Sequence, residues 1–212
     1  MNTIWAFGDS YSTPYDEGPY ISAIKYIEYK GYTPKIFAQV IAETMNFDCT
    51  IKASGGLDNY SIFQNVCDIV DKVKSGDIII IGWSHINRFR IVNKQNEWIP
   101  ILPFTRLNKF IDFNMDALDV VAVNRHEYDE KYASEVDSWI KLINKAYSDC
   151  IVYHWSPFPN TKINLQYFKN IMTITNETKN LIEDGHYSET GHKMLANIFL
   201  NMIFKKQKNE LI

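Results

Sequence analysis

The stretch Asp77–Trp83, DIIIIGW, contains four successive isoleucines with no polar residue between them. A strand with one face in water alternates apolar and polar side chains, so an unbroken apolar run indicates a strand buried on both faces. Such strands occur in parallel sheets that helices cover on both sides. The stretch therefore predicts the central strand of an α/β protein.

Strands and helices alternate along much of the remaining chain. Shorter apolar runs predict further strands, at residues 4–7, 49–53, 150–156 and, as a weaker candidate, 171–174. Apolar residues at helical spacing predict helices over about 33–45, 58–76, 128–147 and 188–204. The first of these helices is expected to start with Thr33 as its cap and Pro34 in its first turn. The sequence thus predicts a three-layer α/β/α sandwich around a mostly parallel sheet.

Residues 88–125 interrupt this alternation. Two apolar arms on either side of residues 93–96 predict a β-hairpin within 88–104, whereas 108–123 fits a helix or a strand. The chain has 212 residues, of which 46% are hydrophobic, and its composition does not shift along its length. We therefore expect residues 1–212 to form a single domain with a hairpin or helical insertion around 88–125.

Composition argues against several classes of partner. The net charge of −3 gives no electrostatic reason to expect nucleic acid binding. No apolar run approaches the length of a membrane span, and no secretory signal pattern precedes the first strand. We therefore expect a cytoplasmic protein, with association with a virion as the alternative location. The oligomeric state does not follow from the sequence.

The three cysteines, Cys49, Cys67 and Cys150, are odd in number and far apart, which favours buried free thiols over disulfides or a metal site.

Polar residues with catalytic potential flank the predicted domain at both ends. Gly8-Asp9-Ser10 follows the first strand, and ligands of parallel sheets bind at the carboxyl ends of the strands. Gly8 allows a sharp turn that presents Ser10 at this edge. Far along the chain, the block Asp184–His192, DGHYSETGH, precedes the last predicted helix. A hydroxyl, an imidazole and a carboxylate are the groups of nucleophilic acyl transfer, so we expect Ser10 and His186 to meet.

On these blocks the sequence resembles the SGNH or GDSL hydrolases, which are esterases and acylhydrolases with a flavodoxin-like sheet. The resemblance implies that Ser10 is the nucleophile, that its N–H is one oxyanion donor, and that His186 is the base. It implies no cofactor and no metal. The stretch Ala53–Ser61, ASGGLDNYS, is similar to the block that supplies a glycine N–H to the oxyanion hole. Gly56 is the implied donor and Gly55 the alternative.

The closing block departs from the family's D-x-x-H spacing. Asp184 lies two residues before His186, and Glu183 occupies the position three residues before it. Either carboxylate can orient the imidazole, and we favour Asp184 because D-x-H forms of this block also resemble the family. His192 is a second candidate base, although it matches the histidine with which the family opens its last helix.

The third block departs further. The family reads G-x-N-D after a buried strand, whereas residues 82–88 here read GWSHINR. Ser84 takes the place of the asparagine that completes the oxyanion hole, and its hydroxyl is a shorter donor than an amide. Asn87 is an alternative donor. SGNH-like sequences from phages and their hosts resemble this GW-S/T pattern followed by arginine. Arg88 is therefore expected to hold the loop, to bind an anionic substrate, or to form a surface ion pair.

Together these residues predict a metal-independent serine hydrolase that cleaves small O-acyl esters through Ser10, His186 and Asp184. A glycan bearing O-acetyl groups is the favoured substrate class, because tyrosines between residues 11 and 32 could form an aromatic wall. The same tyrosines could instead pack on the sheet edge. One alternative is a non-catalytic binding or virion-associated protein with this fold. Another, a nucleotide- or flavin-binding module, is weakened because no glycine-rich phosphate motif follows the first strand.

Overall fold

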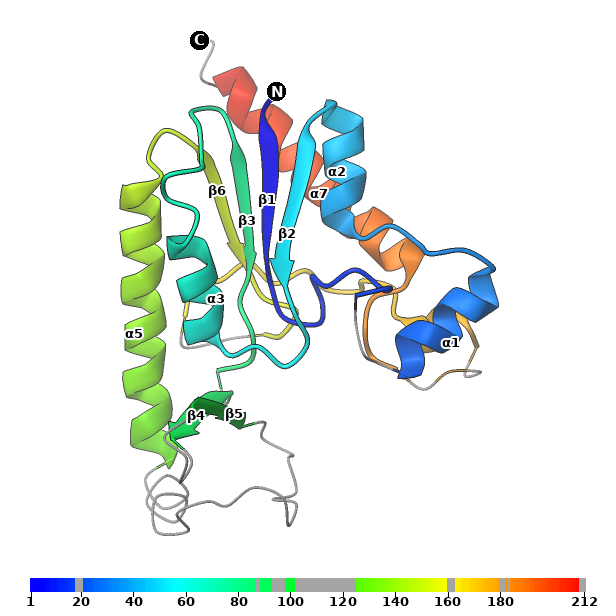
Figure 1. Cartoon of the computed structure of the whole chain (residues 1–212), viewed down its shortest axis with the longest axis horizontal. Helices are drawn as coiled ribbons and strands as arrows, with labels where there is room; N and C mark the ends of the chain where they lie inside the picture. The colour runs from blue at the N-terminus through cyan, green and yellow to red at the C-terminus, as the bar shows by residue number, and fades with distance from the viewer. Residues whose placement is uncertain are drawn as a thin grey trace.

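The computed structural model describes residues 1–17, 21–86, 88–92, 98–101, 125–159, 163–179, 182 and 184–209, with backbone only at 89–92, 98–101 and 125–128. Its main sheet has four strands in the order β2 (Asp48–Ala53), β1 (Thr3–Gly8), β3 (Ile78–Gly82) and β6 (Ile151–Trp155). All neighbouring strands pair in parallel. Helices cover both faces (Figure 1), which confirms the predicted α/β/α sandwich.

The isoleucine run of β3 supplies both halves of the core. Ile78 and Ile80 pack on one face of the sheet, whereas Ile79 and Ile81 pack on the other. None of the four is more than 1% exposed, as expected for a strand buried on both faces. The first face is covered by α2 (Phe37–Met45) and α7 (Glu189–Asn209) and the second by α3 (Asn59–Cys67) and α5 (Arg125–Ala146).

Helix α2 begins later than its sequence predicts. Thr33 does not cap it, because the chain stays extended through Ile36, whose side chain is fully buried in the core. Ile36 is the N-cap, and its N–H donates to the side chain of Gln39 at 3.0 Å. The demand for burial at Ile36 thus outweighs the start signal of Thr33 and Pro34.

Three further expectations are wrong. Residues 171–174 form no strand of the sheet: Thr173 makes one antiparallel bridge to Tyr187 and then caps the short helix α6 (Ile174–Glu177). Helix α3 ends at Cys67 and does not continue to Gly76. The cysteines are free, but Cys49 and Cys67 are exposed, because Cys49 lies on the edge strand β2 and Cys67 at the exposed end of α3.

The region between β3 and α5 contains an antiparallel pair of strands. These are β4 (Phe89–Val92) and β5 (Trp98–Ile101), with Phe89 opposite Ile101. Their position matches the hairpin expected within 88–104. The connection at 93–97 and the ambiguous stretch 108–123 lie outside the described residues. None of the helices in the described parts of the chain is both long and apolar enough to cross a membrane.

Helix α1 (Ile21–Lys30) stands away from the sheet, beside the start of α7 (Figure 1). The buried Tyr26 hydroxyl donates to Glu177 at 2.7 Å and accepts from the Glu189 N–H at 2.9 Å. Lys30 bridges the carboxylates of Glu177 and Glu189 at 3.1 and 2.7 Å. Burial raises the pKa of both glutamates, but their hydrogen bonds outweigh it and lower each pKa to about 2.

The start of β1 is fastened by a buried carboxylate just before β3. Asp77 is 1% exposed and accepts from the N–H of Thr3 and the indole N–H of Trp5, both at 2.9 Å. It also accepts from the N–H of Lys74 at 3.0 Å. One side chain therefore joins the loop before β3 to the neighbouring strand and closes the turn that leads into β3.

We expect Asp77→Ala to lower the free energy of unfolding by about 3 kcal/mol, because three donors lose a charged partner. Urea denaturation measures this change. Asp77→Asn, which keeps one acceptor oxygen, should lose less, and Asp71→Ala on an exposed turn should lose little. Equal losses for Asp77→Ala and Asp71→Ala would contradict the assignment.

The anchor of α1 predicts an acid-dependent stability. The pKa of each glutamate is about 2 in the folded protein and about 4.3 in the unfolded chain. Their contribution to the free energy of unfolding is therefore complete above the unfolded pKa and is lost as the pH falls toward 2. Lys30→Met removes the shared cation and should be less stable than wild type at pH 6, by on the order of 2 kcal/mol. Unfolding followed from pH 6 to pH 2.5 should show this difference shrinking. A constant difference would mean that Lys30 acts by packing alone.

Candidate active site

Ser10 lies on a tight turn at the carboxyl end of β1. A Cβ at Gly8 would meet Ser12 Oγ at 2.5 Å and the carbonyl oxygen of Gly82 at 3.0 Å, so only glycine fits there. The turn is closed by the Ser12 N–H and the Thr13 hydroxyl, which donate to the carbonyl oxygen of Asp9 at 2.9 and 3.0 Å. This geometry leaves Ser10 partly exposed at the edge of the sheet.

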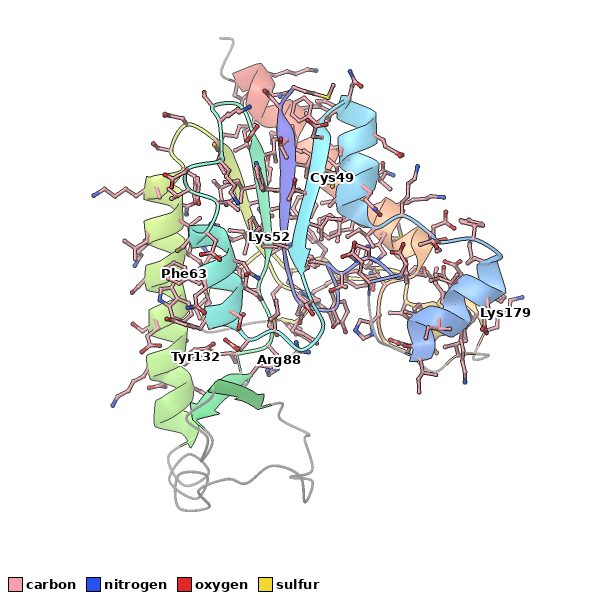
Figure 2. The ribbon with its side chains drawn as sticks, viewed as in Figure 1. Cys49, Lys52, Phe63, Arg88, Tyr132 and Lys179 are labelled. Atoms are coloured by element: carbon pink, nitrogen blue, oxygen red, sulfur yellow. The ribbon has the colours of Figure 1, made fainter. Side chains whose placement is uncertain are left out.

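The side chain of Asp9 is a buried hub beneath this turn. It is 1% exposed and accepts from Arg88 at 2.8 Å, from the Ser84 hydroxyl at 3.0 Å, and from the Tyr11 N–H at 3.1 Å. Arg88 reaches it from below the carboxyl ends of the strands (Figure 2). Its side chain is 14% exposed and also donates to the carbonyl oxygen of Leu57 at 3.4 Å. Of the roles considered for Arg88, these contacts match the one that holds the loop.

The residues predicted to bind the oxyanion differ in their surroundings. Ser84 is 2% exposed and donates its only hydroxyl proton to Asp9, while its carbonyl oxygen accepts from Asn59 at 3.2 Å. In this arrangement its proton is not offered to a substrate. Gly56, in the loop after β2, has a φ of 82° and open space where a Cβ would lie. Asn87 lies outside the described residues.

His186 and Asp184 form a close pair. The ring Nδ1 of His186 lies 2.5 Å from Oδ1 of Asp184, and the His186 N–H donates to the same oxygen at 2.6 Å. Thr175 of α6 supports the pair, because its hydroxyl accepts from the Asp184 N–H at 2.7 Å. Glu183, the alternative carboxylate, lies outside the described residues. A carboxylate on Nδ1 is the arrangement that leaves Nε2 as the base.

The electrostatics keep Asp184 charged at neutral pH. Burial raises the pKa of Asp184, but hydrogen bonds from the His186 ring, the Ser22 hydroxyl and the His186 N–H outweigh it, together with the charge of His186. The net pKa of Asp184 therefore lies below its ordinary value. A carboxylate held in this way stabilises an imidazolium when His186 takes up a proton.

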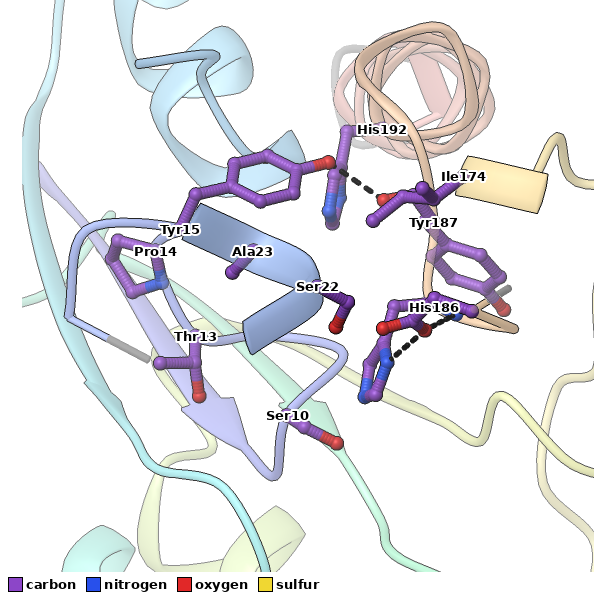
Figure 3. Close-up of a pocket in the computed structure, with 11 residues that line it drawn as sticks. Ser10, Thr13, Pro14, Tyr15, Ser22, Ala23, Ile174, His186, Tyr187 and His192 are labelled. Atoms are coloured by element: carbon purple, nitrogen blue, oxygen red, sulfur yellow. Dashed lines mark hydrogen bonds and ion pairs between the residues drawn. The ribbon is translucent and has the colours of Figure 1, made fainter. Parts of the chain in front are cut away.

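Ser10, Asp184 and His186 line one pocket (Figure 3). The pocket contains about 320 Å³ of space, most of which is open to solvent, so its enclosed part is small. Its other walls come from the turn after β1, α1, α6 and the start of α7, namely Thr13, Pro14, Tyr15, Ser22, Ala23, Ile174, Tyr187 and His192. Gly56, Ser84 and Arg88 are not part of this lining. The topology thus brings the predicted nucleophile and base to one cavity.

His192, the second candidate base, is a buried side chain of this pocket. It is 3% exposed, and its ring centroid lies 5.7 Å from that of Tyr15 and 6.1 Å from that of Phe37. Burial, together with the charge of His186, lowers the pKa of His192 to about 3. His192 is therefore neutral at physiological pH and a weak proton acceptor compared with an ordinary histidine.

Aromatic contacts around His186 were not predicted from the sequence. The ring centroids of Tyr11 and His186 lie 4.7 Å apart with 33° between the ring planes, and those of Phe158 and Tyr11 lie 5.4 Å apart. Burial and the charges of Asp9 and Asp184 raise the pKa of Tyr11 to about 12, so its phenol is neutral. Two features of the sequence could have indicated these contacts. Tyr11 directly follows Ser10, and Phe158 lies just after β6.

The tyrosines singled out in the sequence divide between core and surface. Tyr15 and Tyr26 are buried, and the Tyr15 hydroxyl donates to the carbonyl oxygen of Tyr187 at 2.6 Å. Tyr29 and Tyr32 are 50% and 51% exposed, and Tyr20 lies outside the described residues. Of the tyrosines in this set that the structure describes, Tyr15 alone lines the pocket. Within the described parts of the chain, no three histidine, cysteine or acidic side chains gather as a metal site would require.

Comparison with solved structures identifies the fold. No protein-family model and no curated protein sequence matches the chain. A structure of a carbohydrate esterase, described as displaying divergent catalytic and non-catalytic binding functions, aligns with 95% of this chain and 68% of its own at a TM-score of 0.51 and 14% identity. A lipolytic protein of the G-D-S-L family from Desulfitobacterium hafniense DCB-2 aligns with 93% of this chain and 97% of its own, at a TM-score of 0.37 and 13% identity. The first alignment shows that the chain shares the α/β fold of that carbohydrate esterase, in agreement with the fold class expected from the sequence.

The Asp9–Arg88 pair yields a quantitative expectation. Arg88→Met leaves the Asp9 carboxylate buried without its cation and should lower the free energy of unfolding by about 3 kcal/mol. A double-mutant cycle with Asp9→Asn, followed by urea unfolding, should recover much of that loss in the double variant. The exposed pair Lys141–Asp137 is the matched control, and Lys141→Met should cost about 0.5 kcal/mol or less. Additive losses for Asp9 and Arg88 would show that the pair is not coupled.

Proposed function

We propose that the protein is a metal-independent serine hydrolase that cleaves small O-acyl esters. The observation that carries the proposal is the shared pocket of Ser10 and His186, with Asp184 on Nδ1 of the imidazole. A hydroxyl, a base and a carboxylate that orients the base are sufficient for acyl transfer. The fold shared with a carbohydrate esterase agrees with this chemistry.

The reaction runs in two halves. Ser10 Oγ attacks the ester carbonyl carbon while Nε2 of His186 accepts the hydroxyl proton, and Asp184 stabilises the imidazolium. The tetrahedral oxyanion accepts hydrogen bonds from the N–H groups of Ser10 and Gly56. Collapse breaks the bond to the alcohol, which takes the proton from His186 and leaves an acyl-Ser10 ester. Water, deprotonated by His186, then releases the acid and restores Ser10.

The oxyanion hole sets the expected speed. Because Ser84 donates to Asp9, the site relies on the N–H groups of Ser10 and Gly56 unless the loop rearranges. The loss of one oxyanion donor typically lowers kcat by about 10² to 10³. We therefore expect a slow esterase. The small pocket favours a short acyl group such as acetyl, and the aromatic rings of Tyr11 and Phe158 suit a sugar as the alcohol portion.

The engaged Ser84 hydroxyl also favours a second candidate. A protein that binds an acylated glycan without cleaving it would need the pocket but not a third oxyanion donor. Under this alternative, Ser10 and His186 contact the ligand without reacting. Binding without turnover, measured with the same acetylated glycans, would distinguish it from the hydrolase.

A fluorophosphonate probe and p-nitrophenyl acetate test the hydrolase directly. Wild type should be labelled and should release p-nitrophenol in the presence of EDTA. Ser10→Ala and His186→Ala should each lower kcat by about 10³ or more and abolish labelling. His192→Phe keeps the aromatic packing of the buried ring and should remain labelled. Turnover unaffected by Ser10→Ala would end the proposal, and labelling lost only in the His192 variant would reassign the base.

A further inference from the structure

The segment just after the predicted nucleophile reaches the closing block at two points. The Tyr15 hydroxyl donates to the carbonyl oxygen of Tyr187 at 2.6 Å (Figure 3). The Tyr11 ring contacts two neighbouring rings of that block, because its centroid lies 4.7 Å from that of His186 and 5.1 Å from that of Tyr187. Since Tyr11 directly follows Ser10, these contacts join the turn that carries the hydroxyl to the residues that carry the imidazole.

The backbone of His186 is fixed without any help from Tyr11. Its carbonyl oxygen accepts from the N–H of Ile174 at 2.8 Å, and its own N–H donates to Asp184 at 2.6 Å. The freedom that remains is rotation of the imidazole about its side-chain bonds. The contact of Nδ1 with Asp184 holds one edge of the ring, but a ring held at one edge can still tilt and displace Nε2. A second contact, on the face of the imidazole, restrains such a tilt.

Tyr11 supplies this second contact. The planes of the Tyr11 and His186 rings are 33° apart, and rings at this angle can approach to 4.7 Å only when their faces overlap in part. Tyr11 is itself held in place. Its N–H donates to Asp9 at 3.1 Å, and the ring of Phe158 meets it edge-on, 5.4 Å away at 83°. It also packs against the buried cluster on one side of the sheet.

We propose that Tyr11 is a positioning residue of the active site, whose ring holds the imidazole of His186 at the angle that directs Nε2 toward Ser10. This role rests on the proposed hydrolase function, because Tyr11 acts on the reaction only through His186. The competing explanation is that the Tyr11 ring contacts the substrate alone. A ring that positions the base changes the rate of proton transfer, whereas a ring that contacts the substrate changes mainly its binding.

The test compares Tyr11→Leu, which removes the ring but keeps an apolar side chain, with Tyr11→Phe, which removes only the hydroxyl. Tyr11→Leu should lower kcat for p-nitrophenyl acetate by between about 10-fold and 100-fold with KM nearly unchanged, because His186 is the base in both halves of the reaction. Tyr11→Phe should stay within about threefold of wild type. Tyr29→Leu, the same change at a half-exposed ring that stacks on Tyr26, should leave kcat unchanged.

A second measurement needs no substrate. The proton held between Nδ1 of His186 and Asp184 should give a downfield proton NMR signal in wild type, identified by its loss in Asp184→Asn. A tilting imidazole breaks this hydrogen bond more often, so Tyr11→Leu should broaden the signal through faster exchange with water. Tyr11→Phe, which keeps the ring, should keep the signal sharp.

Two results would overturn the proposal. The first is a raised KM with unchanged kcat in Tyr11→Leu together with a sharp signal, which would make the ring a substrate contact. The second applies if Tyr11→Leu does not fold. Phe158→Leu then loosens Tyr11 without altering the turn of Ser10, and an unchanged kcat and signal in that variant would contradict the proposal. Should wild type lack esterase activity while the signal still depends on the Tyr11 ring, the hydrolase function fails but the positioning of His186 stands.

Discussion

The buried charge of Asp9 is the constraint on which the site depends. A carboxylate that is 1% exposed cannot remain in the interior without donors, and its donors here come from two different loops. Tyr11 belongs to the turn of the nucleophile, whereas Ser84 and Arg88 follow β3. Arg88 continues to the carbonyl oxygen of Leu57, in the loop after β2. One negative charge thus joins the loops after three neighbouring strands and fixes the turn of Ser10.

This arrangement gives the altered third block a physical meaning. The family that the sequence resembles has an asparagine at the position of Ser84, and here the Ser84 hydroxyl donates to Asp9. The arginine that follows in the same block supplies the matching cation. Ser84 and Arg88 therefore act together as a support for the turn that carries Ser10, and under the proposed function an oxyanion would rely on backbone N–H groups.

The sequence predicts the layers of the fold well and local details less well, and it singles out Ser10 and His186, which the structure brings to one pocket. The isoleucine run could only be a strand covered on both faces, and the blocks around Ser10 and His186 carry their own spacing signals. By contrast, the start of α2 depends on the burial of Ile36, which overrides the cap signal of Thr33. The contacts of Tyr11 with His186 and of Tyr26 with Glu177 join segments far apart in the chain, and no local pattern encodes such pairings.

The central place of β1 in the sheet also bears on how the protein matures. β1 pairs with β2 and with β3, and the N–H of Thr3 donates to the carboxylate of Asp77, which lies 74 positions later in the chain. During synthesis this strand leaves the ribosome with an exposed apolar run and no neighbour, so early fragments are vulnerable to aggregation and to chaperone capture. The imidazole of His186 leaves the ribosome much later still. Nascent chains therefore pass through a long interval in which Ser10 has been synthesised and His186 has not.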